Sequence, residues 1–122
     1  MENTKVKRKI IKQITSEQLD AIIAEKSFTI IDVRDAKAIM KQGIIPCAIN
    51  LPLESIQSDF DQVRRENSDV FIEKEPLLFC CTGGVMSYVA ALKAQEEGFS
   101  NVYNLEGGHA GWMKFKQTQE AA

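Results

Sequence analysis

Two adjacent cysteines, Cys80 and Cys81, have the residue type and the setting that covalent chemistry needs. They end an apolar run that begins at Leu77, and the glycine pair Gly83–Gly84 follows one residue later. A helical pattern starts near Met86, so the unpaired N–H groups and the positive dipole end of that helix face the loop. Such surroundings favour a thiolate over a thiol and hold an anionic sulfur. The segment therefore predicts a reactive cysteine at the end of a strand.

Only one of the two sulfurs can face this loop, because neighbouring side chains on a strand point to opposite faces of the sheet. We interpret Cys80 as a core residue, since cysteine is among the most commonly buried residue types. We interpret Cys81 as the reactive thiol. A disulfide between adjacent cysteines would need a strained ring and is not expected.

Strands and helices alternate along the chain around this loop. We expect strands over 27–33, 47–50, 77–81 and 101–105, and helices over 15–26, 35–40, 54–67 and 86–97, with a last helix after Gly107–Gly108. This order predicts an α/β fold with a mostly parallel sheet. Ligands of such sheets bind beyond the carboxyl ends of the strands, which is where Cys81 lies.

The length and composition indicate one ordinary globular domain. Hydrophobic residues make up 44% of the 122 residues and charged residues 26%, with a formal net charge of −2, which argues against a nucleic-acid partner. We expect a flexible basic amino terminus over 1–9, a single domain over 10–116 and a loose tail over 117–122.

The sequence also bears on the cellular location. No apolar stretch approaches the roughly 20 residues of a membrane span, and no continuous apolar segment follows the basic start as in a secretory signal. Three cysteines are an odd number in a chain with enough apolar residues to fold without cross-links, so no disulfide framework is expected. These features predict a cytoplasmic protein with no membrane partner.

Several motifs resemble those of the single-domain rhodaneses, a family of sulfurtransferases. They match in the order of the family: Asp32-Val33-Arg34, the segment Gly43–Pro52, the loop Cys81–Ser87, and the segment Gly98–Gly108 followed by Trp112. The resemblance runs from about residue 12 to 116. It implies a rhodanese-like fold with about five strands and helices on both faces of the sheet.

The resemblance implies a chemistry as well. Cys81 corresponds to the nucleophile of the family, which takes a sulfane sulfur from a donor such as thiosulfate, stands as a persulfide and passes the sulfur to a thiol or cyanide. The implied partners are a small sulfur donor and a thiol acceptor, protein thiols included, and the family requires no metal or organic cofactor. The implied substrate-binding loop consists of Thr82, Gly83, Gly84, Val85, Met86 and Ser87.

Three positions depart from the family pattern. Met86 stands where the loop usually has arginine, so the fork that grips an anionic donor is missing and thiosulfate is expected to be a poor donor. Ile44 replaces a histidine, and Cys47 replaces a glycine. We interpret Cys47 as a buried structural sulfur; the alternative is a resolving thiol that approaches Cys81.

Two other functions compete with sulfur transfer. The first is a noncatalytic rhodanese-like module that binds a protein partner, because the apolar Met86 suits a contact surface. The second is phosphatase or arsenate-reductase chemistry, which also uses a cysteine loop. The short span from Cys81 to Ser87 and its lack of arginine argue against this second alternative.

The remaining candidates are assigned mainly structural roles. Asp32 and Arg34 are expected to form an internal ion pair or hydrogen bonds that brace the loops, in support of the site. His109 is expected to be a solvent-exposed or capping residue, and Trp112 a core residue. No lysine follows Gly83–Gly84 at the spacing of a phosphate-binding loop, so nucleotide binding is not expected.

Overall fold

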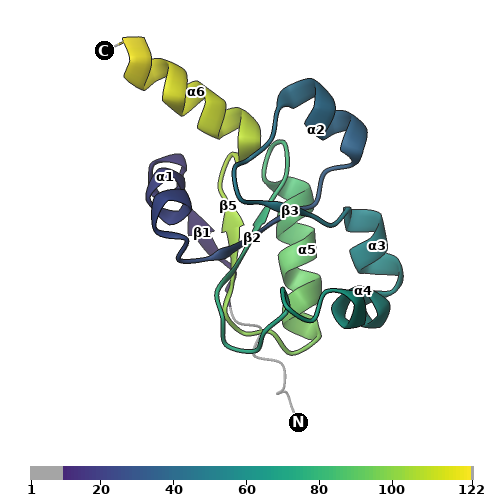
Figure 1. Ribbon diagram of the computed structural model, residues 1–122. Coiled ribbons are helices and arrows are strands. Elements are labelled where there is room, and N and C mark those ends of the chain that lie inside the picture. The colour runs from purple at the N-terminus through teal and green to yellow at the C-terminus, as the bar shows by residue number, and fades with distance from the viewer. Residues whose placement is uncertain (1–9, 122) are drawn as a thin grey trace.

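A parallel sheet of five strands forms the centre of the computed structural model, which describes residues 10–121 (Figure 1). The strands are β1 Lys12–Ile14, β2 Thr29–Asp32, β3 Ile49–Asn50, β4 Leu77–Cys80 and β5 Val102–Leu105. Their order in the sheet is β1-β5-β4-β2-β3, and every neighbouring pair is parallel. The predicted α/β fold is confirmed.

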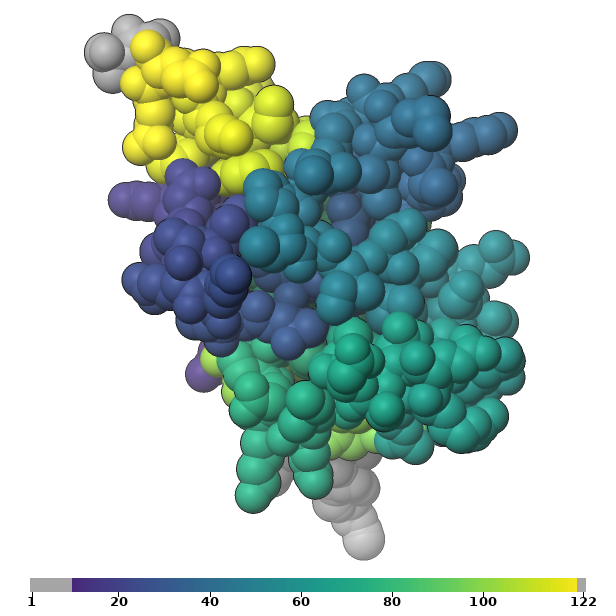
Figure 2. Space-filling model, in the orientation of Figure 1, coloured from purple at the N-terminus to yellow at the C-terminus, as the bar shows by residue number. Residues whose placement is uncertain are grey.

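Helices cover both faces of this sheet, as expected (Figure 1). They are α1 Ser16–Glu25, α2 Ala36–Gln42, α3 Leu53–Ser58, α4 Phe60–Glu66, α5 Val85–Glu96 and α6 Gly108–Ala121. Helices α1 and α6 lie against each other, which Figure 2 shows as the contact between purple-blue and yellow atoms. Helices α3, α4 and α5 contribute to the core on the other face.

The strand β4 shows how one short sequence serves both cores. All four of its residues are buried. Leu77 and Phe79 belong to the cluster that includes α3, α4 and α5, whereas Leu78 and Cys80 belong to the cluster with α1 and α6. The near-continuous apolar run is typical of a strand covered on both faces.

The strand β1 was not expected. Lys12 and Gln13 are exposed and only Ile14 is buried, so the segment lacks the apolar signal of the inner strands. It pairs with β5 at the edge of the sheet, where a strand has one neighbour and tolerates charged residues.

The segment 54–67, expected as one helix, forms the two helices α3 and α4. Asp59 separates them with nonhelical φ and ψ angles of −155° and 77°. Its carboxylate accepts a hydrogen bond of 3.1 Å from the Gln62 amide and so caps α4, as aspartate does at helix N-termini.

The expected limits of the domain differ at the carboxyl end. Helix α6 continues to Ala121, so the helix includes most of the segment 117–122 that was expected to be a loose tail. The segment 1–9 and Ala122 lie outside the described residues. Within the described part of the chain, no helix has both the length and the apolar character to cross a membrane.

Candidate active site

The loop between β4 and α5 turns sharply at Gly84. This residue is the N-cap of α5 and has a φ of +95°, a conformation that only glycine adopts at little cost. A Cβ atom there would lie 3.2 Å from the Leu105 carbonyl oxygen and 3.2 Å from the Gly107 nitrogen. Glycine therefore lets the first turn of α5 close around the end of β4.

This turn surrounds the sulfur of Cys81 with donors. The Sγ atom accepts hydrogen bonds from the Gly84 amide at 3.1 Å and from the Ser87 amide at 3.3 Å. The Ser87 hydroxyl lies 3.2 Å from the same sulfur. Cys81 is only 2% exposed and Ser87 is fully buried. The buried sulfur thus lies in a polar cradle formed by the start of α5.

These contacts decide the direction in which the pKa of Cys81 shifts. Burial alone raises this pKa, because a thiolate loses water. Hydrogen bonds from the Ser87 side chain and from the Ser87, Gly84 and Gly83 amides stabilise the anion and outweigh the burial, so the pKa of Cys81 is lowered. A lowered pKa is what a nucleophilic thiol needs near neutral pH.

The chemical environment of Cys80 is the opposite. Its side chain packs with Trp112 and Leu78 on the α1 and α6 face. Burial raises the pKa of Cys80 well above its ordinary value, and the nearby Asp32 carboxylate adds to the effect. The prediction that Cys80 is a core residue is confirmed.

The first residues of α6 also hold the loop, through backbone hydrogen bonds. The His109 amide donates a hydrogen bond of 2.8 Å to the Cys81 carbonyl, and the Ala110 amide donates one of 3.0 Å to the Thr82 carbonyl. A Cβ atom on Gly108 would lie 2.4 Å from the Thr82 carbonyl oxygen. The second glycine of the pair Gly107–Gly108 is therefore required for this close approach.

Asp32 and Arg34 form the expected internal ion pair. Their closest atoms, Nη2 and Oδ2, are 2.6 Å apart, and both side chains are almost fully buried. Arg34 also donates to the Gln42 side-chain oxygen at 3.1 Å and to the Gly43 carbonyl at 3.0 Å. The hydroxyl of Thr82 donates to the same oxygen of Gln42 at 2.9 Å. The pair thus braces α2 against the cysteine loop.

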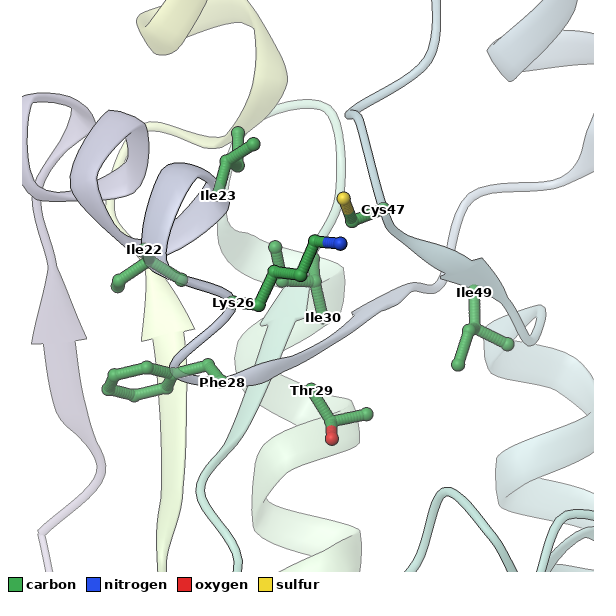
Figure 3. A pocket seen from close by; sticks show the side chains of 8 residues that line it. All are labelled: Ile22, Ile23, Lys26, Phe28, Thr29, Ile30, Cys47 and Ile49. Carbon is green, nitrogen blue, oxygen red and sulfur yellow. The ribbon is translucent and has the colours of Figure 1, made fainter.

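Cys47 lies away from this cradle. It is exposed, so the interpretation as a buried structural sulfur is wrong. It lines a groove of about 320 Å³ with Ile22, Ile23 and Lys26 (Figure 3). This groove is on the α1 face of the sheet, whereas Cys81 belongs to the core on the α5 face. The arrangement does not support a resolving role toward Cys81.

The backbone of Cys47 has a conformation that is uncommon for residues other than glycine. Its φ is +69°, in the left-handed region that glycine adopts at little cost. The loop before β3 keeps this conformation in spite of the cysteine side chain.

His109 is buried, with 3% of its surface exposed, and the expectation of an exposed or capping residue is wrong. Its ring lies 6.1 Å from the ring of Trp112, centroid to centroid. Burial lowers the pKa of His109, and the nearby Arg34 charge lowers it further. No local pattern predicted this burial, because a histidine after two glycines is typical of a surface turn.

The rim of the loop is apolar. Val85 is 76% exposed and Met86 is 44% exposed, at the two positions just before the buried Ser87. The expected loop residues therefore divide into two groups. Gly83, Gly84 and Ser87 contribute to the polar cradle, whereas Thr82, Val85 and Met86 are exposed.

Asn104, near the end of β5, is a site residue that the sequence analysis missed. It is 3% exposed and lies 2.5 Å from the Ser87 hydroxyl, oxygen to oxygen. An amide within the otherwise apolar stretch 102–105 was the available signal.

Within residues 10–121, no three His, Cys, Asp or Glu side chains are grouped so that they could hold a metal ion.

The chain is similar in sequence to known proteins. The family described as "Rhodanese-like domain" matches residues 15–115. The thiosulfate sulfurtransferase GlpE of Shewanella oneidensis is 32% identical over 101 residues, which are 83% of this chain and 91% of that protein.

Two solved structures show the same fold. The single-domain sulfurtransferase RDL2 of Saccharomyces cerevisiae has a TM-score of 0.75 at 23% identity, over 93% of this chain and 97% of that one. A protein of Rhodopseudomonas palustris, described as a possible tyrosine phosphatase, has a TM-score of 0.77 at 24% identity, over 95% of this chain and 97% of that one. At these identities the likeness concerns the fold alone.

Proposed function

Since the chain belongs to the rhodanese-like domain family, we propose that it is a sulfurtransferase that carries a sulfane sulfur on Cys81. The observation that supports this most is the sulfur of Cys81 itself, which accepts hydrogen bonds from the Gly84 and Ser87 amides. These donors favour the thiolate, and a thiolate is the form that attacks sulfur.

The reaction has two steps. The Cys81 thiolate attacks the sulfane sulfur of the donor, and a new S–S bond forms as the S–S bond of the donor breaks. The bonding pair leaves with the rest of the donor, as sulfite from thiosulfate or as a thiolate from an organic persulfide. An acceptor thiolate or cyanide then attacks the outer sulfur, and the electron pair returns to Cys81. Covalent catalysis thus divides one transfer into two displacements.

The amides around the loop stabilise the charge that moves during these steps. They are fixed in position before the donor arrives, which is how preorganised donors lower a barrier. The lowered pKa of Cys81 has the same origin.

The rim of the loop favours an organic donor over thiosulfate. Val85 and Met86 are exposed apolar residues, and no loop arginine grips a small dianion. A hydrogen bond to a charged group contributes about 1.5–3 kcal/mol, which is about ten- to a hundredfold in binding. We therefore expect low-molecular-weight or protein-borne persulfides to load Cys81 faster than thiosulfate does.

Mass spectrometry tests the proposal directly. The protein is exposed to thiosulfate and, separately, to a low-molecular-weight persulfide, and each cysteine peptide is examined with and without dithiothreitol. We expect one added sulfur on Cys81, lost on reduction, and none there in Cys81→Ser. Cys47→Ser is the matched control and is expected to load normally. Failure of every donor to add sulfur to Cys81 would contradict the proposal.

The exposed rim also motivates a second candidate, a noncatalytic module that binds a protein partner through Val85 and Met86. In that case Cys81→Ser binds the partner as well as the wild type does, and no donor is turned over. Turnover of a phosphate ester would instead favour the phosphatase alternative.

A further inference from the structure

The hydroxyl of Ser87 has one proton and two neighbours that can accept it. The Oδ1 atom of Asn104 lies 2.5 Å from the hydroxyl oxygen, and the Sγ atom of Cys81 lies 3.2 Å from it. All three residues are buried. The protonation state of Cys81 is thus linked to which of the two neighbours accepts the hydrogen bond of the Ser87 hydroxyl.

The orientation of the Asn104 amide is fixed by a partner that can only accept. Its nitrogen Nδ2 lies 3.0 Å from the Gly84 carbonyl oxygen and 3.0 Å from the side-chain oxygen of Gln13. Because a carbonyl oxygen has no proton to give, the group of Asn104 that faces Gly84 must be the NH₂ group. Its oxygen therefore faces Ser87, and at 2.5 Å Ser87 is the donor.

The Cys81 sulfur receives no hydrogen bond from the Ser87 hydroxyl while that hydroxyl donates to Asn104. A protonated Cys81 can donate its S–H to the serine oxygen, since a hydroxyl oxygen accepts as well as donates. When Cys81 ionises, the sulfur can only accept, and the hydroxyl must turn from Asn104 to stabilise it. Ionisation of Cys81 therefore breaks the hydrogen bond between Ser87 and Asn104.

We propose that Asn104 is a positioning residue. It accepts the hydrogen bond of the Ser87 hydroxyl while the Cys81 sulfur is uncharged, and it loses that bond to the sulfur when the sulfur becomes a thiolate. This inference rests on the proposed function for its role in catalysis. In the persulfide the charge lies on the outer sulfur, and the Ser87 hydroxyl donates to Asn104 again. As the outer sulfur departs to an acceptor, charge develops on Sγ of Cys81, and the hydroxyl donates to this sulfur.

Other titratable groups near the loop do not take part in this chain of contacts. They are Cys80 on β4, the Asp32–Arg34 pair at the end of β2, and His109 at the start of α6. The variants below leave all of them unchanged, so they act as a constant background in the measurement.

The pKa of Cys81 tests the proposal without any sulfur donor. It is taken from the pH dependence of iodoacetamide labelling of Cys81, resolved by mass spectrometry from labelling of Cys47 and Cys80. Asn104→Leu removes the competing oxygen, so we expect the pKa of Cys81 to fall by about half to one unit, the worth of one neutral hydrogen bond. Ser87→Ala is expected to raise it.

The double variant separates this role from a merely structural one. In a Ser87→Ala background, Asn104→Leu is expected to leave the pKa of Cys81 unchanged, because no serine proton remains to be released. An equal shift in both backgrounds, or no downward shift with Ser87 present, would overturn the proposal. Asn104→Ser, which withdraws the oxygen with less change in polarity, gives the same comparison if Asn104→Leu does not fold. A protein that shows the shift but transfers no sulfur would refute the proposed function alone.

Discussion

Thr82 donates its hydroxyl proton to the side-chain oxygen of Gln42, forty positions earlier in the chain, over 2.9 Å. The same oxygen accepts from Nη1 of the buried Arg34 at 3.1 Å. One amide oxygen therefore links the residue after Cys81 to the ion pair at the end of β2.

This link predicts different costs for its two ends. Gln42→Leu leaves Nη1 of Arg34 without this acceptor, and we expect the free energy of unfolding to fall by about 1–3 kcal/mol. Thr82→Val removes only an exposed hydroxyl and is expected to cost less than about 1 kcal/mol. Urea denaturation of both variants measures the difference, and equal losses would contradict the bracing role of Gln42.

Removing the acid of the ion pair should have a larger effect. Asp32→Ala leaves the guanidinium of Arg34 buried without its counter-charge, which is expected to lower the free energy of unfolding by about 3–5 kcal/mol. Asp61→Ala is the matched control, because the pair Asp61–Arg64 is exposed and such pairs contribute about 0–1 kcal/mol. Similar losses for the two variants in denaturant titrations would show that burial of the Asp32–Arg34 pair has no energetic consequence.

The buried His109 predicts a pH dependence of stability. Burial and the charge of Arg34 lower its pKa in the folded protein, so below its ordinary value of about 6.5 the unfolded chain binds the proton more readily. We expect the free energy of unfolding to decrease as pH falls below about 6.5, and His109→Gln to reduce that decrease. Denaturant titrations across this range measure both slopes; the same slope in the variant would assign the dependence to other groups.

Restoring a cation to the loop should widen the choice of donor. Met86→Arg places a guanidinium on the loop, and we expect kcat/KM with thiosulfate to rise about ten- to a hundredfold, with little change for an organic persulfide. Val85→Arg adds the same charge one residue away, on a side chain that is 76% exposed, and is expected to have a small effect. No gain from Met86→Arg, or an equal gain from Val85→Arg, would contradict the explanation by a missing cation.

The features that the sequence predicted are those with a strong local or periodic signal. The buried strands β2 and β4 are apolar on both faces, and the capping box formed by Thr15 and Gln18 starts α1 where the pattern placed it. The assignment of the two cysteines to opposite faces followed from the alternation of a strand. Each of these depends on residues that are adjacent or nearly adjacent in the chain.

The features that were missed depend on contacts between distant segments. Strand β1 is defined by its pairing with β5, and two of its three residues are exposed. His109 is buried because α6 docks its first amides on the carbonyls of Cys81 and Thr82. Asn104 meets Ser87 across the interface of β5 and α5. None of these partners lies within the windows from which a periodicity is read.

The bonds from α6 to the Cys81 and Thr82 carbonyls have a thermodynamic consequence. A loop whose carbonyl groups are held by hydrogen bonds loses little conformational entropy when a substrate sulfur enters it. The entropy of ordering the cradle is therefore spent once, when the chain folds, and not again in every catalytic cycle.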